Sequence, residues 1–165
     1  MRKLFLIGLA LALVLCGCGA RETLETIADD IPAEPVLGQM REISVRLPDG
    51  AVSPVLKSEA EQLYLSEDYE ILVQTCPAGN LNDTIRKLTG FDKEQLTVME
   101  TEQDGAKRYD FVWAAAGEDG ERLGRAAILD DGSYHYCLSV LRDAQGEKSQ
   151  VVWSEVFSSF GLGKL

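Results

Sequence analysis

Apolar and polar residues alternate along much of the chain from residue 41 onward, with the period of two that is typical of half-buried strands. The alternation appears first at 41–47 and again at 63–65. It is followed at 69–76 by the residues YEILVQTC, which are rich in β-branched and aromatic types. Turn-forming residues end each stretch, so each is predicted to be a separate strand. Further strands are expected near 96–102, 107–116, 122–129 and 133–142.

Asp-Gly pairs separate the last four predicted strands from one another. Such pairs readily take the positive φ angles of tight hairpin turns, and short connections join antiparallel neighbours, so the pattern predicts an antiparallel meander. The pairs are Asp104-Gly105, Asp119-Gly120 and Asp131-Gly132. Two stripes of residues on these strands are expected to form much of the core: Tyr109, Phe111 and Trp113, and Tyr134, Tyr136, Leu138 and Val140.

Two segments carry apolar residues at helical spacing. The first begins after Asn80, which is suited to cap a helix N-terminus, and ends at Gly90. The second is expected near 148–160, ended by Gly161, with Trp153 partly exposed at the flank of its apolar face. The apolar positions are Leu81, Ile85 and Leu88 in the first segment and Val152, Val156 and Phe160 in the second. This order of elements predicts an α+β fold, an antiparallel sheet with helices packed on it.

The N-terminal segment has a different pattern. Arg2 and Lys3 precede an unbroken apolar run at 4–15, and small residues and cysteines follow the run. This is the order of a secretory signal peptide. A permanent membrane-spanning helix needs about 20 apolar residues, more than this run offers. The sequence therefore predicts a signal peptide at 1–17.

The end of this run, Leu15-Cys16-Gly17-Cys18, resembles the processing site of bacterial lipoproteins. Cleavage there requires small residues at the cut bond, and Gly17 before Cys18 meets this requirement better than Leu15 before Cys16. The resemblance implies that Cys18 carries a diacylglyceryl group on its sulfur and becomes the mature N-terminus. The protein would then be lipid-anchored in the cell membrane, facing outside the cytoplasm. An ordinary signal peptide is the alternative.

The remaining chain is expected to comprise a lipidated N-terminus with a flexible tether at 18–40 and a single domain at 41–165. The formal net charge of −11 becomes more negative once the basic leader is removed. An acidic surface is repelled by phosphate backbones and by anionic lipid headgroups. We therefore expect no nucleic-acid partner, and attachment to the membrane through the lipid alone.

Cys76 and Cys137 are the cysteines left in the predicted domain. An exported protein lies in a compartment that permits disulfide bonds, so these two residues are a possible disulfide. The alternative is a pair of buried free thiols that fill space in the core.

His135 is the only histidine of the chain, and the strand pattern places it on the same side as Cys137. Two such residues are too few for a zinc site, and no GxSxG motif accompanies the histidine. Acidic pairs such as Asp130-Asp131 lie in predicted turns, where solvated carboxylates are usual. The sequence therefore predicts no catalytic residue, no metal site and no cofactor.

The order of strands, helix, meander and terminal helix resembles the α-β-α sandwich of PsbP-like domains over roughly residues 41–165. The resemblance rests on the strand at 134–141 and on the aromatic residues of the last helix. The segments ILVQTC and YHYCLSVLRDA are also similar to small uncharacterised lipoproteins of Gram-positive gut bacteria. A β-lactamase-inhibitor-like or cystatin-like sheet is the alternative fold.

This resemblance implies a non-enzymatic accessory or binding domain, with an envelope protein as a possible partner. Two alternatives remain open. One is a small-ligand or cation-binding protein with its site between helix and sheet, which requires a concave pocket with convergent polar groups. The other is a hydrolase that uses His135, which requires this residue in a cleft beside a carboxylate and a hydroxyl or thiol group.

Overall fold

The computed structural model describes residues 37–51, 53–117, 120–144 and 150–164, all within one compact unit, Leu37–Leu165. The predicted signal peptide, Cys18 and most of the predicted tether lie outside the described residues, as does the turn at Asp119. None of the helices in the described part of the chain is long and apolar enough to span a bilayer.

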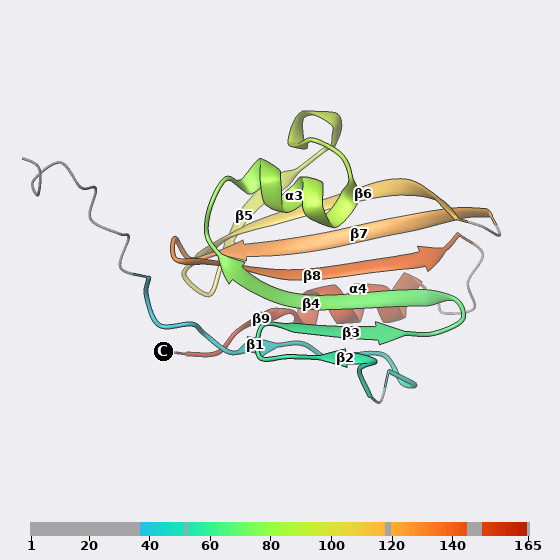
Figure 1. The fold of residues 1–165 in the computed structure, drawn as a ribbon, viewed down its shortest axis with the longest axis horizontal. Coiled ribbons are helices and arrows are strands. Elements are labelled where there is room, and N and C mark those ends of the chain that lie inside the picture. Colours follow the sequence, from blue (N-terminus) through green and yellow to red (C-terminus); the bar gives the residue numbers. More distant parts are fainter. Residues whose placement is uncertain (1–36, 52, 118–119, 145–149, 165) are drawn as a thin grey trace, which may run out of the picture. The chain divides into compact units, whose positions relative to one another are not determined.

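The domain is built on a seven-stranded antiparallel sheet with the order β2-β3-β4-β8-β7-β6-β5 (Figure 1). The predicted meander of the last four long strands is confirmed, because β5, β6, β7 and β8 pair in chain order. The pairing of β4 with β8 joins this meander to the earlier strands. The strands are β2 (Leu56–Lys57), β3 (Glu61–Leu65), β4 (Tyr69–Pro77), β5 (Met99–Gln103), β6 (Ala106–Gly117), β7 (Gly120–Asp130) and β8 (Tyr134–Asp143).

A second, two-stranded sheet brings the ends of the domain together. Its strands are β1 (Ile43–Ser44) and β9 (Gly161–Leu162), which pair antiparallel. The predicted strand at 41–47 is wrong in extent, because its partner has only two residues. The alternation in this segment has another cause: Ile43, Val45 and Leu47 all pack against the main core.

Two helices pack on opposite faces of the main sheet, α3 (Leu81–Thr89) and α4 (Gln150–Ser159) (Figure 1). The predicted cap of α3 is confirmed, since the backbone N–H of Asn82 donates to the Asn80 side chain at 2.9 Å. The predicted end is also confirmed, with Gly90 in the left-handed conformation at φ 81°. Together with the sheet, these helices form the predicted α+β fold.

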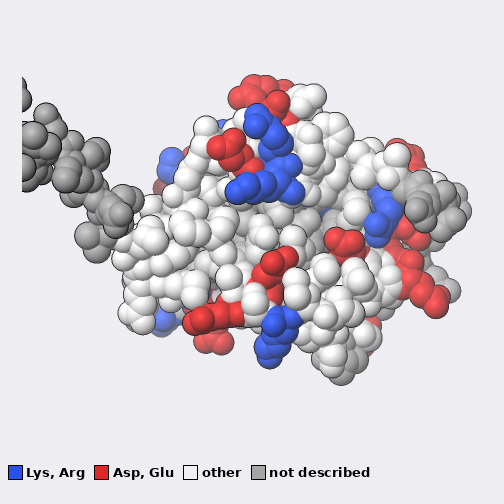
Figure 2. All heavy atoms as spheres, in the orientation of Figure 1, with Lys and Arg blue, Asp and Glu red and all other residues white. Residues whose placement is uncertain are grey.

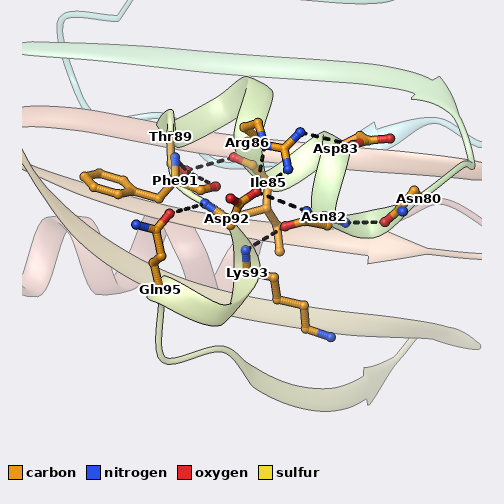
Figure 3. A network of polar contacts seen from close by, with 10 residues as sticks. All are labelled: Asn80, Asn82, Asp83, Ile85, Arg86, Thr89, Phe91, Asp92, Lys93 and Gln95. Carbon is orange, nitrogen blue, oxygen red and sulfur yellow. Dashed lines mark hydrogen bonds and ion pairs between the residues drawn. The ribbon is translucent and has the colours of Figure 1, made fainter.

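A short 3-10 helix, η1 (Lys93–Gln95), follows α3 and is fastened to it by side-chain hydrogen bonds (Figure 3). The Asp92 carboxylate accepts from Asn82 Nδ2 at 3.1 Å and from Arg86 Nε at 2.7 Å. Asn82 Oδ1 in turn accepts from the backbone N–H of Lys93 at 2.7 Å. These bonds hold the start of η1 against α3.

The two faces of the sheet bury separate cores. On the α4 face, Leu138 and Val140 pack with Trp153 and Phe157. On the α3 face, the core is formed by Ile85 with the strand residues Tyr109, Phe111, Trp113, Ala126, Ile128 and Cys137. Both predicted stripes therefore belong to the hydrophobic core, but they lie on opposite faces of the sheet. The expectation that Trp153 is partly exposed is wrong: it is 4% exposed, because it packs edge-on against Tyr69.

Gly124 on β7 lies directly opposite Trp113 on β6, and the indole ring occupies the space that a side chain at 124 would need. We expect Gly124→Ala to destabilise the domain by about 1–3 kcal/mol, the usual cost of overpacking a core. Gly79→Ala is the matched control, since no heavy atom lies within 4 Å of a Cβ there. Urea denaturation of both variants measures the difference, and equal midpoints would contradict this packing.

Candidate functional site

The fold brings together the three candidate residues of the sequence analysis. Cys76 on β4 lies directly opposite His135 on β8, and Cys137 is two residues further along β8, opposite Gln74. All three side chains therefore point to the α3 face, with Cys137 diagonal to Cys76. The predicted placement of His135 beside Cys137 is thus observed, and the register adds Cys76 to the group.

The two thiols are free in the structure, and each shifts the pKa of the other. The hydrogen bond that the Cys137 thiol donates to the Cys76 sulfur lowers the pKa of Cys76 well below its usual value, and His135 and Lys87 act in the same direction. The same bond and the complete burial of Cys137 raise the pKa of that thiol well above its usual value. Cys76 is therefore the sulfur that ionises first. The disulfide between them remains a prediction.

His135 is only 1% exposed and is held by polar contacts on both sides of its ring. Its Nδ1 lies 2.8 Å from Thr84 Oγ1 on α3, and its Nε2 lies 3.7 Å from Asp130 Oδ2 on β7. A histidine buried this deeply does not meet a substrate in a cleft. The arrangement therefore weighs against the hydrolase alternative.

The acidic pair Asp130-Asp131 shapes the turn between β7 and β8. Asp130 Oδ1 accepts from the backbone of Gly132 at 2.8 Å, and Asp131 Oδ1 accepts from the backbone of Ser133 and Tyr134 at 2.9 and 2.8 Å. Burial raises the pKa of the Asp131 carboxyl, but these bonds outweigh it and hold the pKa below its usual value. Among the described residues, no group of three or more His, Cys, Asp or Glu side chains could hold a metal ion.

A groove of about 780 Å³ lies on the opposite face of the sheet, beside α4. Its floor is apolar, and two floor residues have large exposed fractions: Val112 on β6 at 63% and Met99 on β5 at 59%. Trp153 and Phe157 of α4 form part of its wall. No pattern in the sequence was assigned to this groove, although residues 111–114 are apolar in succession and thus on both faces of β6.

Arginine side chains supply the charge of this groove. Arg125 on β7 is the register partner of Val112, and its guanidinium lies 4.2 Å from the centre of the Phe157 ring. Its Nη2 is 3.9 Å from Asp110 Oδ1, but that carboxylate is already held by Arg108 through contacts of 2.6 and 3.0 Å. Arg142 also lines the groove. Positive charge is therefore in excess over the one carboxylate that lines the groove.

The guanidinium of Arg125 is partly desolvated, and this burial lowers its pKa. A partly desolvated cation gains more from an added anion than a fully hydrated one does, because water screens the attraction less. The groove thus combines an apolar floor with the guanidinium of Arg125, whose neighbouring carboxylate, Asp110, is already bound by Arg108.

Comparisons with known proteins identify no family for this chain. No protein-family model matches it, and no curated protein matches it. A crystal structure of a protein from Bacteroides thetaiotaomicron is similar, with a TM-score of 0.49 and 13% sequence identity. The match covers 74% of this chain and 45% of that chain, so this chain spans less than half the length of that protein. A similarity of this level carries no argument about function.

The lowered pKa of Cys76 predicts an unusual pH profile for its alkylation. The thiolate is the reactive form, and a lowered pKa means that Cys76 is already ionised at pH 6. In reduced protein, iodoacetamide should therefore modify Cys76 at rates that differ by no more than about threefold between pH 6 and pH 8. An ordinary cysteine becomes roughly 75-fold faster over this interval.

The charged and titratable groups that act on Cys76 are Cys137 and His135 of β8 and Lys87 of α3. Peptide mapping of the alkylated protein assigns the rate to residue 76, and Cys76→Ser should remove the fast reaction. A rate at Cys76 that rises as steeply as that of a free peptide cysteine would contradict the arrangement.

Proposed function

We propose that this protein is a lipid-anchored, non-enzymatic binding module of the cell envelope, and that its groove binds a small apolar molecule carrying an anionic group. The observation that carries the proposal is the pairing of an exposed apolar floor at Val112 and Met99 with the excess positive charge of Arg125 and Arg142. The binding domain would thus take a small ligand, and a protein partner is the competing outcome.

The apolar floor supports a ligand with a hydrophobic body. A groove of about 780 Å³ falls in the range of small-molecule sites, which are mostly apolar and carry a few well-placed polar groups. The aromatic wall formed by Trp153 and Phe157 is rigid, because both side chains are buried in the core of the α4 face. A planar or aliphatic molecule would bury Val112, which is otherwise largely exposed.

The arginines support an anionic group on that ligand. A carboxylate, sulfonate or phosphate could accept hydrogen bonds from Arg125 without displacing Arg108, which keeps its own bonds to Asp110. The cation-binding alternative has less support, because positive charge is in excess in the groove and because the described residues contain no ligand cluster.

The location of the module rests on the N-terminal sequence. A basic start, an apolar run and the Leu15-Cys16-Gly17-Cys18 segment favour export and lipidation at Cys18. Two buried acyl chains would hold the protein in the membrane with negligible release, whereas a single chain binds only marginally. A domain carried in this way would meet small molecules at the cell surface.

Anilinonaphthalene sulfonate is a suitable probe of the groove, since it joins an apolar body to one anionic group. We expect it to bind saturably, with increased fluorescence. Arg125→Gln should raise its Kd about tenfold, the loss of one charge-assisted hydrogen bond of ~1.4 kcal/mol. Val112→Asp should abolish binding, because it adds a negative charge to the apolar floor.

Val55→Asp is the matched control for Val112→Asp, because Val55 is 62% exposed and does not line the groove. It should leave the Kd unchanged. N-phenylnaphthylamine, which lacks the sulfonate, should bind more weakly and should not respond to Arg125→Gln. Equal binding of both probes, or of the probe to Val112→Asp protein with an intact circular dichroism spectrum, would refute the proposed site.

The anchor is tested separately from the groove. Expressed in a bacterium with a lipoprotein pathway, the full-length protein should sediment with membranes, and mass spectrometry should find a diacylglyceryl-modified N-terminus at Cys18. Cys18→Ser should release it from the membrane fraction, whereas Cys16→Ser should not. An unmodified N-terminus at any other residue would disprove lipid anchoring while leaving the groove untouched.

A further inference from the structure

The paired thiols on the α3 face are the chemical group that the proposed binding function does not use. We propose that Cys76 and Cys137 form a redox-active pair that reacts with small-molecule disulfides, with Cys76 as the attacking sulfur and Cys137 as the resolving sulfur. The groove lies on the other face of the sheet, so this inference does not rest on the proposed ligand.

The two cysteines differ in access. Cys76 is half-buried and stands next to Pro77, the last residue of β4. Cys137 is fully buried in the core between the sheet and α3. A small disulfide can therefore reach the Cys76 sulfur, and it cannot reach the Cys137 sulfur without opening of the core.

The surroundings favour a negative charge on Cys76. Cys137 lies diagonal to Cys76 and His135 lies directly opposite it on β8, and both lower the pKa of the Cys76 thiol. Lys87 in the last turn of α3 adds a positive charge. Figure 2 shows basic side chains over α3 on this face of the molecule, with acidic side chains beside them. Thiolates in such electropositive, partly exposed surroundings are the reactive ones.

The histidine is held in place for this role. Thr84 Oγ1 lies 2.8 Å from its Nδ1, and Asp130 Oδ2 lies 3.7 Å from its Nε2, so α3 and β7 both restrict the ring. His135 is therefore a positioning residue that stabilises the Cys76 thiolate. It does not need to contact the disulfide.

The reaction balances in two steps. The Cys76 thiolate attacks one sulfur of a disulfide R–S–S–R, which forms the mixed disulfide Cys76–S–S–R and releases one thiolate R–S⁻. The Cys137 thiol then gives its proton to that thiolate, and its sulfur attacks the Cys76 sulfur. The second step forms the Cys76–Cys137 disulfide and releases the second R–S⁻. The protein loses two electrons, and R–S–S–R is reduced to two thiols.

The register favours the second step, because it places Cys137 diagonal to Cys76 on the neighbouring strand and on the same face of the sheet. Residues placed diagonally on neighbouring strands lie about 7–8 Å apart, so a disulfide between them requires a small backbone movement and is strained. We therefore expect a bridge that free thiols reduce readily, unlike the resistant bridges of purely structural sites. The pair would act as a reversible switch that reacts once per protein molecule.

The test uses reduced full-length protein in which Cys16→Ser and Cys18→Ser leave Cys76 and Cys137 as the only cysteines. This protein is mixed with hydroxyethyl disulfide at neutral pH, quenched with acid and analysed by mass spectrometry. The native protein should pass through a transient adduct that peptide mapping places on Cys76. It should end as an adduct-free species that has lost two hydrogen atoms. Dithiothreitol under native conditions should restore the starting mass.

Variants separate the two steps. Cys137→Ser should stop at one stable adduct per chain, and Cys76→Ser should lower the rate of modification of the folded protein by at least about tenfold. Because Cys137 is buried, Cys137→Ala provides a second variant in case the serine disturbs the core, and the transient adduct on the native protein needs no variant.

Three results would overturn the inference: no adduct on Cys76 in the folded protein, an adduct on native protein that never closes to the disulfide, or a bridge that resists dithiothreitol without unfolding. The last result would indicate a structural disulfide. Binding of anilinonaphthalene sulfonate can be measured on the same samples, so failure of the thiol pair is distinguished from failure of the groove.

Discussion

The pairing of β4 with β8 joins the early strands to the C-terminal meander, and both cores depend on its register. The pairs run without interruption from Tyr69↔Arg142 to Pro77↔Tyr134. Since side chains alternate between faces, a slip of one residue would turn every side chain of one strand to the opposite layer. Such a slip would separate Cys76 from the face that it shares with His135. The core and the thiol pair are thus set by one ladder of backbone hydrogen bonds.

Burial of β8 on both faces creates the layered arrangement and the groove. Its side chains are buried toward α4 and toward α3, where His135 and Ser139 are buried as well, so each face needs a covering helix. Helix α4 packs on residues of β4 and β8, such as Ile71 and Val140, and leaves part of β5 and β6 without cover. The groove is therefore a consequence of how far one short helix extends across a wide sheet.

Arg108 links the charge of the groove to the docking of α4. This buried guanidinium binds Asp110 and also donates to the carbonyl oxygens of Phe157 and Phe160 at 3.0 and 3.3 Å. A cation at the C-terminal end of a helix interacts favourably with the helix dipole. With Asp110 engaged in this way, the neighbouring Arg125 keeps only a long contact to it. The proposed anion site thus arises beside an ion pair whose first role is structural.

The sequence alone determined the features that are encoded within a few neighbouring residues. Asn80 and Gly90 bound their helix, and the Asp-Gly turns at 104–105 and 131–132 set the meander, because caps and turns depend on local backbone conformation. The tertiary structure decided whatever depends on distant partners. Cys76, His135 and Cys137 were each recognisable as candidate site residues from their residue type. Only the β4–β8 register brings them together. The length of β1 likewise depended on the short strand that follows the last helix, and the groove depended on where that helix packs. No local pattern in the sequence specifies either.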